Sequence, residues 1–426
     1  MARLLVATVP LTGHVQPMLV LVRTLIERGH EVRWYAGSKF APAIEATRAT
    51  FEPMRSARDW DDADVEAAIP ALRGTRGLAR VKMQLREMFI APMGDQLRDL
   101  QAITDAFSPD VVIADSAHLG ASLLRETRDL AWAGVGISAL VIPSVDTAPF
   151  GSALPPGKSQ LRNRLLNWVI FRCLFGTVNR SYRRARAAAG VPAGKRMYFD
   201  VLSPDVFLQP TIPELEYPRS DLPPQVHFIG PLIPRANPGA VLPPWWPELE
   251  AAHRRGVPIV LVTQGTLATD PRELISPALA GLAGEKLFVV ATTGSLEIAP
   301  ANARVAPFIP FDALMPMLSA MVTNGGYGAV QTAVRHGVPL VVAGGSEEKP
   351  EIAARVAWCG AGINLRTGRP KPTAVRGAVR RVLDESRWKA RCGELAAIMA
   401  KHDSPTEGAS LIEALVARGS SGRLAS

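Results

Sequence analysis

The chain has 426 residues, 47% of them hydrophobic and 20% charged, which is typical of a globular protein that buries sizeable cores. This length favours two domains of roughly 200 residues each. The formal net charge of +9 fits either a general arginine bias or attraction to an anionic cosubstrate. Because no basic block with interleaved aromatic residues occurs, nucleic-acid binding is not expected.

Cysteine usage and the N-terminal residues indicate a cytoplasmic protein. Cys173, Cys359 and Cys392 are too far apart for a CxxC pair, so we expect unpaired, buried thiols in a reducing compartment. The apolar run at residues 4–9 is too short for the core of a signal peptide. No stretch reaches the about 18 apolar residues that span a bilayer, so stable membrane insertion is not expected.

The first half of the chain alternates buried strands with helices. Residues 4–9 predict a strand, "PLTGHVQP" a loop, residues 18–27 a helix with one apolar stripe, and residues 31–36 a second strand. This βαβ opening implies a parallel sheet. Further strands are expected at 109–115, 132–140, 206–209 and 226–229, a variable helical lobe at 55–105, a loop at 143–156 and helical structure at 161–189.

The most apolar helical segment is "LLNWVIFRCLF" at residues 165–175, which Arg172 interrupts. We interpret it as a helix that faces the core. Contact with a membrane surface or with an apolar ligand is the alternative.

A proline-rich tract separates this half from a second series of strands and helices. The prolines of "GPLIPRANPGAVLPPWWP" resist both helix and sheet. We therefore divide the chain into an N-terminal Rossmann-like domain (1–225), a linker (226–247), a C-terminal Rossmann-like domain (248–400) and a helical tail (401–426) that packs back on the first domain. The predicted class is α/β, with two doubly wound parallel sheets that face one another across a ligand cleft.

A glycine-rich turn in the second half predicts an anion site. In "TNGGYGAVQTAVRHG", Gly325, Gly326 and Gly328 let backbone N–H groups approach a ligand just before a helix. A helix N-terminus offers free donors and the positive end of the dipole. The alternative is that these glycines only permit tight packing of the helix on the sheet.

His14 and Asp115 are the candidate proton-transfer residues. Each follows or ends a predicted strand of the first sheet, so both are expected at the same sheet edge, where an aspartate could fix the tautomer of a basic imidazole. The alternative is a capping histidine and a strand-end aspartate that never meet, and His118 is the rival base. No GxSxG, HExxH or P-loop motif occurs, nor does GxGxxG follow the first strand.

With these residues established, the chain resembles the family 1 glycosyltransferases of the GT-B fold, especially bacterial enzymes of the macrolide or antibiotic type. The resemblance covers nearly the whole chain. It rests on the ordered set "GHVQP", "VIAD", "ELEYPRSDLPPQVHFIGPL", "TQGT", "PFIPFDALMP" and the glycine-rich stretch.

The resemblance implies that His14 deprotonates an acceptor hydroxyl with support from Asp115, and that the sugar is inverted at its anomeric carbon. The donor would be a UDP- or dTDP-sugar, and the acceptor an apolar small molecule such as a polyketide, macrolide or flavonoid. It further implies nucleotide and diphosphate contacts from one set of residues: Gly265, Thr266, Phe308, Ile309, Asn324, Gly325, Gly326, Gly328, Ala329 and Thr332. Glu348 and Lys349 would contact the sugar. No cofactor and no metal are expected.

Four positions depart from the family pattern. Asn324 stands where the family has histidine, so a positive charge is missing, and Ala329 lacks the usual hydroxyl. Thr332, with Gln331 beside it, replaces the residue that holds the ribose. Glu348 and Lys349 replace an Asp-Gln pair that reads the sugar. We expect a weaker or altered donor site rather than an inactive one.

Two alternatives remain open at this stage. A GT-B protein without catalytic activity could serve as a partner or scaffold, and the departures at Asn324 and Ala329 favour that reading. A glycosyltransferase acting on a lipid or cell-wall precursor would suit the apolar segment at 165–175. A monomer and a homodimer are equally compatible with the sequence.

Overall fold

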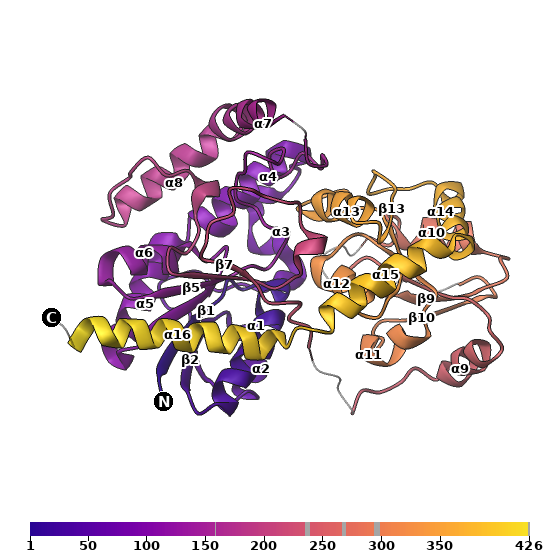
Figure 1. The fold of residues 1–426 in the computed structure, drawn as a ribbon, viewed down its shortest axis with the longest axis horizontal. Coiled ribbons are helices and arrows are strands. Elements are labelled where there is room, and N and C mark those ends of the chain that lie inside the picture. Colours follow the sequence, from indigo (N-terminus) through magenta and orange to yellow (C-terminus); the bar gives the residue numbers. More distant parts are fainter. Residues whose placement is uncertain (158, 235–238, 266–269, 294–298, 425–426) are drawn as a thin grey trace.

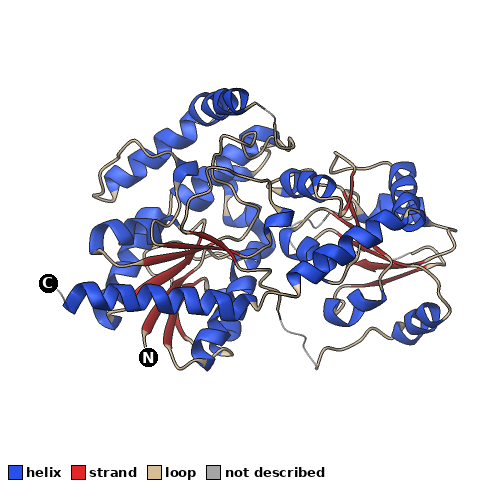
Figure 2. Ribbon diagram, viewed as in Figure 1, coloured by secondary structure: helices blue, strands red, loops and turns tan. Residues whose placement is uncertain are grey.

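The computed structural model describes residues 1–157, 159–234, 239–265, 270–293 and 299–424. Two parallel sheets form its two halves (Figures 1 and 2). The first sheet has seven strands in the order β3-β2-β1-β4-β5-β6-β7, and the second has six in the order β10-β9-β8-β11-β12-β13. The first strand of each half pairs on both sides with strands that follow it in the chain, β1 with β2 and β4, and β8 with β9 and β11. This confirms the predicted doubly wound α/β architecture.

The first half contains the following elements. Its strands are β1 (Arg3–Ala7), β2 (Glu31–Ala36), β3 (Thr50–Pro53), β4 (Val111–Asp115), β5 (Trp132–Val135), β6 (Val206–Gln209) and β7 (Val226–Phe228). Its helices are α1 (Thr12–Glu27), α2 (Ala41–Glu45), α3 (Val65–Ala68), α4 (Gly77–Gln84), α5 (Met93–Phe107), α6 (Leu119–Arg128), α7 (Gln160–Asn167) and α8 (Gly176–Ala188). Two π-helical segments, η4 (Leu85–Ile90) and η5 (Trp168–Leu174), and the short helices η1 (Ser38–Phe40), η2 (Asp62–Asp64), η3 (Pro70–Leu72), η6 (Tyr198–Asp200) and η7 (Pro213–Leu215) complete it.

The second half repeats the alternation. Its strands are β8 (Ile259–Thr263), β9 (Phe288–Thr292), β10 (Ala303–Ala306), β11 (Ala320–Thr323), β12 (Leu340–Val342) and β13 (Gly362–Asn364). Its helices are α9 (Trp246–Arg254), α10 (Ile275–Leu282), α11 (Phe311–Leu314), α12 (Tyr327–Arg335), α13 (Lys349–Trp358), α14 (Pro372–Asp384), α15 (Ser386–Met399) and the short η8 (Met315–Met317). The chain ends in α16 (Ser404–Leu424).

Each sheet is buried on both faces, which explains why the strands are continuous apolar runs. In β1, Leu4 and Val6 belong to the core beneath α1 and α16, whereas Leu5 and Ala7 belong to the core beneath α5 and α6. All four side chains are fully buried. Because successive strand residues point to opposite faces, a single strand anchors both helix layers.

The last helix returns to the first half, as Figure 1 shows. Ala409 and Ile412 of α16 are fully buried in the core that contains α1. Glu413 accepts hydrogen bonds or ion pairs from Arg28 at 2.8 Å and from His30 at 3.0 Å. The C-terminal helix, which follows the second half in the chain, is therefore fixed to the first half.

Several local predictions need correction. The strand expected at 226–229 forms as β7 and pairs with β6 in the first sheet, although the linker was drawn from residue 226. The strand expected at 132–140 ends at Val135, and the short edge strands β3 and β13 had no sequence signal. Cys359 and Cys392 are unpaired and buried as expected, but Cys173 is exposed. No described helix is long and apolar enough to cross a membrane.

The segment at 165–175 also differs from its preferred interpretation. It spans α7 and η5, where Leu165 and Trp168 are more than half exposed while Asn163 and Asn167 are buried. The start of the segment therefore exposes its apolar residues, whereas Phe171 and Phe175 are buried in the core of the first half, as the interpretation expected.

Candidate active site

The predicted His14–Asp115 pair forms in the structure. Nδ1 of His14 lies 3.1 Å from Oδ1 of Asp115, and both side chains are buried. Asp115 is the last residue of β4, and His14 follows β1, the strand next to it. Parallel neighbours end at the same edge of a sheet, which is why residues 101 positions apart in the chain meet.

His14 lies in a helix rather than in the loop that the sequence predicted. Helix α1 begins at Thr12, whose N–H donates to Oδ2 of Asp62 at 2.7 Å. This carboxylate supplies the cap that Leu11 cannot offer. Pro17 lies near the start of α1, where it removes only the bond to the carbonyl of Gly13, so the helix continues through it.

Asp115 is held ionised by its surroundings. Oδ2 accepts from the N–H of Val9 at 2.8 Å, and Oδ1 accepts from the N–H of Ala117 at 2.8 Å. Burial by itself raises the pKa of Asp115, but the nearby His14 ring and the backbone donors outweigh burial, so this pKa lies below its usual value. A charged Asp115 fixes the Nδ1–H tautomer of His14. Nε2 has no hydrogen-bond partner among the described residues.

His118, the rival base, is buried beside Asp115. Only 1% of its surface is exposed, and neither ring nitrogen has a hydrogen-bond partner among the described residues. Burial lowers the pKa of His118 to about 4, although Asp115 acts in the opposite direction. It is therefore neutral at pH 7 and packs edge-on against Tyr35, with ring centroids 5.7 Å apart.

The buried His118 predicts a pH dependence of stability. Because the unfolded chain protonates this residue below about pH 6.5 and the folded chain only near pH 4, the free energy of unfolding should fall as the pH drops between these values. The shift corresponds to about 3 kcal/mol. Urea unfolding from pH 7 to pH 4.5 should show a shallower loss for His118→Leu than for the wild type. Equal slopes for the two proteins would contradict the prediction.

The glycine-rich turn lies between β11 and the N-terminus of α12, in the strand–turn–helix position that the sequence predicted. Gly325 has φ +91°, and a Cβ on it would lie 3.0 Å from the Val342 side chain, so packing accounts for this glycine. At Gly328 a Cβ would meet nothing within 4 Å, and at Gly326 it would approach only Asn324 Oδ1, at 3.9 Å. Protein packing therefore does not require the last two glycines, whereas close approach of a ligand would.

Asn324 connects the "TQGT" loop after β8 with the glycine-rich turn. Its amide nitrogen donates to the carbonyl of Gln264, and its Oδ1 accepts from the N–H of Gly326 at 3.3 Å. Gly265 has φ +74°, and a Cβ added to it would lie 3.7 Å from Oδ1 of Asn324. The "TQGT" loop and the glycine-rich turn thus lie together. Thr266 lies outside the described residues.

A cavity of ≈ 340 Å³ lies against this turn and brings two cations to it. Its lining includes Asn324, Lys349, Gly345, Gly368 and Arg369. Nζ of Lys349 is 2.6 Å from the carboxylate of Glu347, and the side chain is largely buried. The sequence had identified the loss of a histidine charge at Asn324, and the structure places Lys349 in the same cavity.

Glu348, which belongs to the second half, is close enough to His14 for the two side chains to interact electrostatically. It precedes α13, and burial followed by the neighbouring Glu347 raises the pKa of Glu348. His14 acts on the same carboxyl in the opposite direction, although the two residues belong to different halves. The predicted base and the predicted sugar contact are therefore close enough to interact electrostatically.

The remaining predicted donor residues occupy mixed positions. Phe308 is 68% exposed on the loop before α11, and Ile309 is buried beneath it. An exposed aromatic ring on a packed support suits stacking on a base. Ala329 packs on the core of the second half. The Thr332 hydroxyl donates to the carbonyl of Gly328 at 2.8 Å within α12, so it is engaged with the helix itself.

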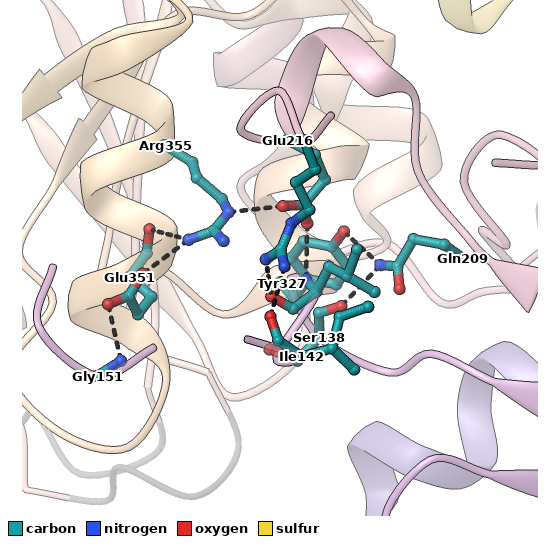
Figure 3. Close-up of polar contacts among 10 residues, drawn as sticks. Ser138, Ile142, Gly151, Gln209, Glu216, Tyr327, Glu351 and Arg355 are labelled. Atoms are coloured by element: carbon teal, nitrogen blue, oxygen red, sulfur yellow. Dashed lines mark hydrogen bonds and ion pairs between the residues drawn. The ribbon is translucent and has the colours of Figure 1, made fainter. Parts of the chain in front are cut away.

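Sequence reasoning missed the ion pairs that join the halves (Figure 3). Arg355 of α13 donates through Nε to Glu216 at 2.8 Å and through Nη1 to Glu351 at 2.8 Å. Glu351 in turn accepts from the N–H groups of Gly151 at 2.8 Å and Ala153 at 2.6 Å, which lie in the loop before α7. Glu216 lies in the quoted "ELEYP" motif, but nothing local in the sequence identifies its partner.

A second bridge lies beside these ion pairs. Gln209, the last residue of β6, donates through Nε2 to the carbonyl of Ser138 at 2.8 Å and approaches the Tyr327 hydroxyl at 3.3 Å. Burial raises the pKa of Tyr327, so its hydroxyl stays protonated. Because Tyr327 begins α12, the glycine-rich turn is tied to the first sheet.

A larger cavity lies away from this site. Its volume is ≈ 550 Å³, and its lining includes Arg125, Glu126 and Trp132. Trp132 begins β5, so this cavity lies at the sheet edge opposite Asp115. Open α/β sheets bind ligands outside the carboxyl ends of their strands. The candidate active site is therefore the group of residues at the junction of the halves rather than this cavity.

Solved structures with the same architecture define the class. The chain superposes on the glycosyltransferase of kitacinnamycin with a TM-score of 0.74 and 22% identity, covering 97% of this chain and 98% of the other. The calicheamicin glycosyltransferase also gives 0.74 with 22% identity, covering 98% and 99%. The fold is GT-B, the two-domain fold of these glycosyltransferases.

Sequence comparisons identify the family. The chain is 44% identical to 4'-demethylrebeccamycin synthase of Lentzea aerocolonigenes, over 97% of this chain and 100% of that protein. It is 35% identical to UDP-glycosyltransferase 2 of Phaeomoniella chlamydospora, over 92% and 90%. Residues 285–415 match the family model described as the C-terminal domain of erythromycin biosynthesis protein CIII-like proteins. The chain belongs to the bacterial family 1 glycosyltransferases and is an enzyme of the antibiotic and natural-product type.

Proposed function

We propose that this glycosyltransferase moves a sugar from a UDP- or dTDP-sugar to a hydroxyl of an apolar small molecule, with inversion at the anomeric carbon and His14 as general base. One observation carries the proposal. His14, oriented by Asp115 at 3.1 Å, lies within electrostatic range of Glu348 of the donor side. This proximity supports a base for the acceptor beside a contact for the sugar.

The transfer would proceed as one displacement. Nε2 of His14 takes the proton of the acceptor hydroxyl while its oxygen attacks the anomeric carbon. The bond from that carbon to the diphosphate oxygen breaks, and the nucleoside diphosphate leaves with the electron pair. Asp115 stabilises the imidazolium that forms.

Charge on the leaving diphosphate would be stabilised by the second half. The N-terminus of α12 would offer the backbone N–H of Gly328, and Lys349 and Arg369 line the adjacent cavity. These cations suit a reaction that uses no metal and would replace the charge lost at Asn324. A related structure is a glycosyltransferase in complex with dTDP, at TM-score 0.69 and 21% identity.

The acceptor would lie on the first-half side of His14. The Phe89 ring of η4 stacks near the imidazole, with centroids 6.2 Å apart and planes at 22°. An aromatic wall beside the base favours an apolar, ring-containing acceptor.

Product analysis tests the proposal directly. The full chain is incubated with UDP-glucose or dTDP-glucose, both α-configured, and a panel of hydroxylated aromatic compounds. We expect a β-linked glucoside, identified by the anomeric proton coupling in NMR, from at least one pair. An α-linked product would contradict inversion. Absence of any product together with no binding of UDP or dTDP by calorimetry would contradict the function itself.

A further inference from the structure

In the helical segment formed by α7 and η5, two asparagine side chains are buried while several large apolar side chains are exposed. Asn163 and Asn167 point inward, where their amide groups donate to loop carbonyls, Asn163 to Val145 at 3.0 Å and Asn167 to Ser144 and Thr147 at 3.1 Å each. These bonds fix the rotation of the helix about its axis. The buried face of α7 is therefore polar, whereas Phe171 and Phe175 further along the segment are buried in the core of the first half.

The opposite face is apolar and exposed. We call it the outward face, and it consists of Leu161 (79% exposed), Leu165 (60%), Trp168 (56%), Val169 (39%) and Leu174 (37%). The first four recur at i, i+4, i+7 and i+8, which places them on one side of the helix. Figure 1 shows α7 and α8 at the rim of the first half. A contiguous exposed apolar surface of this kind marks an interaction site.

The segment that carries the outward face has only basic charged residues, although Asp146 accepts a hydrogen bond from Gln160 at the start of α7. Residues 147–199 contain no aspartate or glutamate. Arg162, Arg164 and Arg172 are exposed on the same segment and form no ion pair with any described residue. Two copies of this face would repel each other, so self-association is disfavoured. A negatively charged partner is complementary.

We propose that the outward face docks on the surface of an anionic lipid bilayer. Leucine and tryptophan side chains enter the boundary between headgroups and acyl chains, where tryptophan is favoured. The long arginine side chains reach the headgroup phosphates while their stems stay against the apolar stripe. Because α7 and η5 together are too short to span a bilayer, the helix lies in the interface rather than across it.

Co-sedimentation of the full chain with vesicles tests this. The wild type should bind vesicles that contain phosphatidylglycerol and phosphatidylcholine, bind phosphatidylcholine alone at least about tenfold more weakly, and dissociate as salt rises. Arg164→Glu/Arg172→Glu and Leu165→Asp/Trp168→Asp should each weaken binding by at least about tenfold.

Matched controls distinguish the outward face from charged and apolar residues elsewhere on the surface. Arg376→Glu and Leu242→Asp alter an exposed arginine and an exposed leucine of the second half, and both should bind like the wild type. Thermal melts confirm that each variant is folded. A wild type that does not bind acidic vesicles, or outward-face variants that bind unchanged, would overturn the proposal. So would a concentration-dependent dimer in sedimentation velocity that Leu165→Asp/Trp168→Asp abolishes.

Discussion

Replacing His14 with alanine should lower kcat of glycosyl transfer by about 10²–10⁴-fold, the range that a positioned general base contributes. The nucleotide cavity is built from the second half, so the donor KM should change by less than about threefold. Initial rates at saturating acceptor measure both constants. His253→Ala, at an exposed position away from the site, is the control and should retain wild-type kinetics.

Asp115→Asn separates orientation of the base from its presence. The amide can keep the contact with Nδ1 of His14 at 3.1 Å. It can also turn its NH₂ group toward Nδ1, which selects the wrong tautomer of His14. The substitution removes the negative charge that stabilises the imidazolium. We expect most of the loss seen in His14→Ala. The double variant should be no slower than His14→Ala, because the two residues act as one unit. Additive losses would contradict the dyad.

The fold could be predicted because its strands are buried on both faces. Runs such as "VVIAD" and "IVLVT" are apolar throughout, and only a parallel sheet covered by two helix layers makes such runs necessary. The edge strands β3 and β13 were not predicted, for the opposite reason. They are short and only partly buried, so their residues carry no such pattern.

The active site could be predicted where the backbone alone determines position. His14 and Asp115 follow neighbouring parallel strands, and topology brings them together. The position of Lys349 could not be predicted in this way, since the sequence shows only that a cation stands where the family has a neutral residue. Its place in the cavity beside Asn324 depends on how α13 packs against the glycine-rich turn.

Helix orientation and long-range ion pairs need the tertiary structure. The stripe at 165–175 has the spacing of a core helix, and only the structure shows that Leu165 and Trp168 are exposed while Phe171 is buried in the core. Arg355 and Glu216 are 139 positions apart, on different halves. Neither side chain has a local feature that distinguishes it from a surface charge.

The second large effect should come from Arg355→Met. Arg355, Glu216 and Glu351 are each at most 5% exposed at their side chains, so the variant leaves two carboxylates buried without their cation. Removing one member of a buried ionic group costs about 3–5 kcal/mol. We expect urea unfolding to show a loss of this size. Arg380→Met, which breaks a more exposed pair with Glu285, should cost less than about 1 kcal/mol.

A triple variant distinguishes the cost of unpaired charge from the value of the contacts. Arg355→Met/Glu216→Gln/Glu351→Gln removes all three charges, so it should recover most of the stability lost in Arg355→Met. Activity should not recover in parallel. Glu351 holds the N–H groups of Gly151 and Ala153 against α13, the helix that follows Glu348.

Without these ion pairs, the loop before α7 and the donor side lose their fixed relation, and an acceptor is no longer held in line with the sugar. Such misplacement lowers kcat even though no reacting group has changed. A stable triple variant with wild-type kcat would show that the ion pairs only join the two halves. A stable triple variant with kcat reduced about tenfold or more would show that they also align the two substrates.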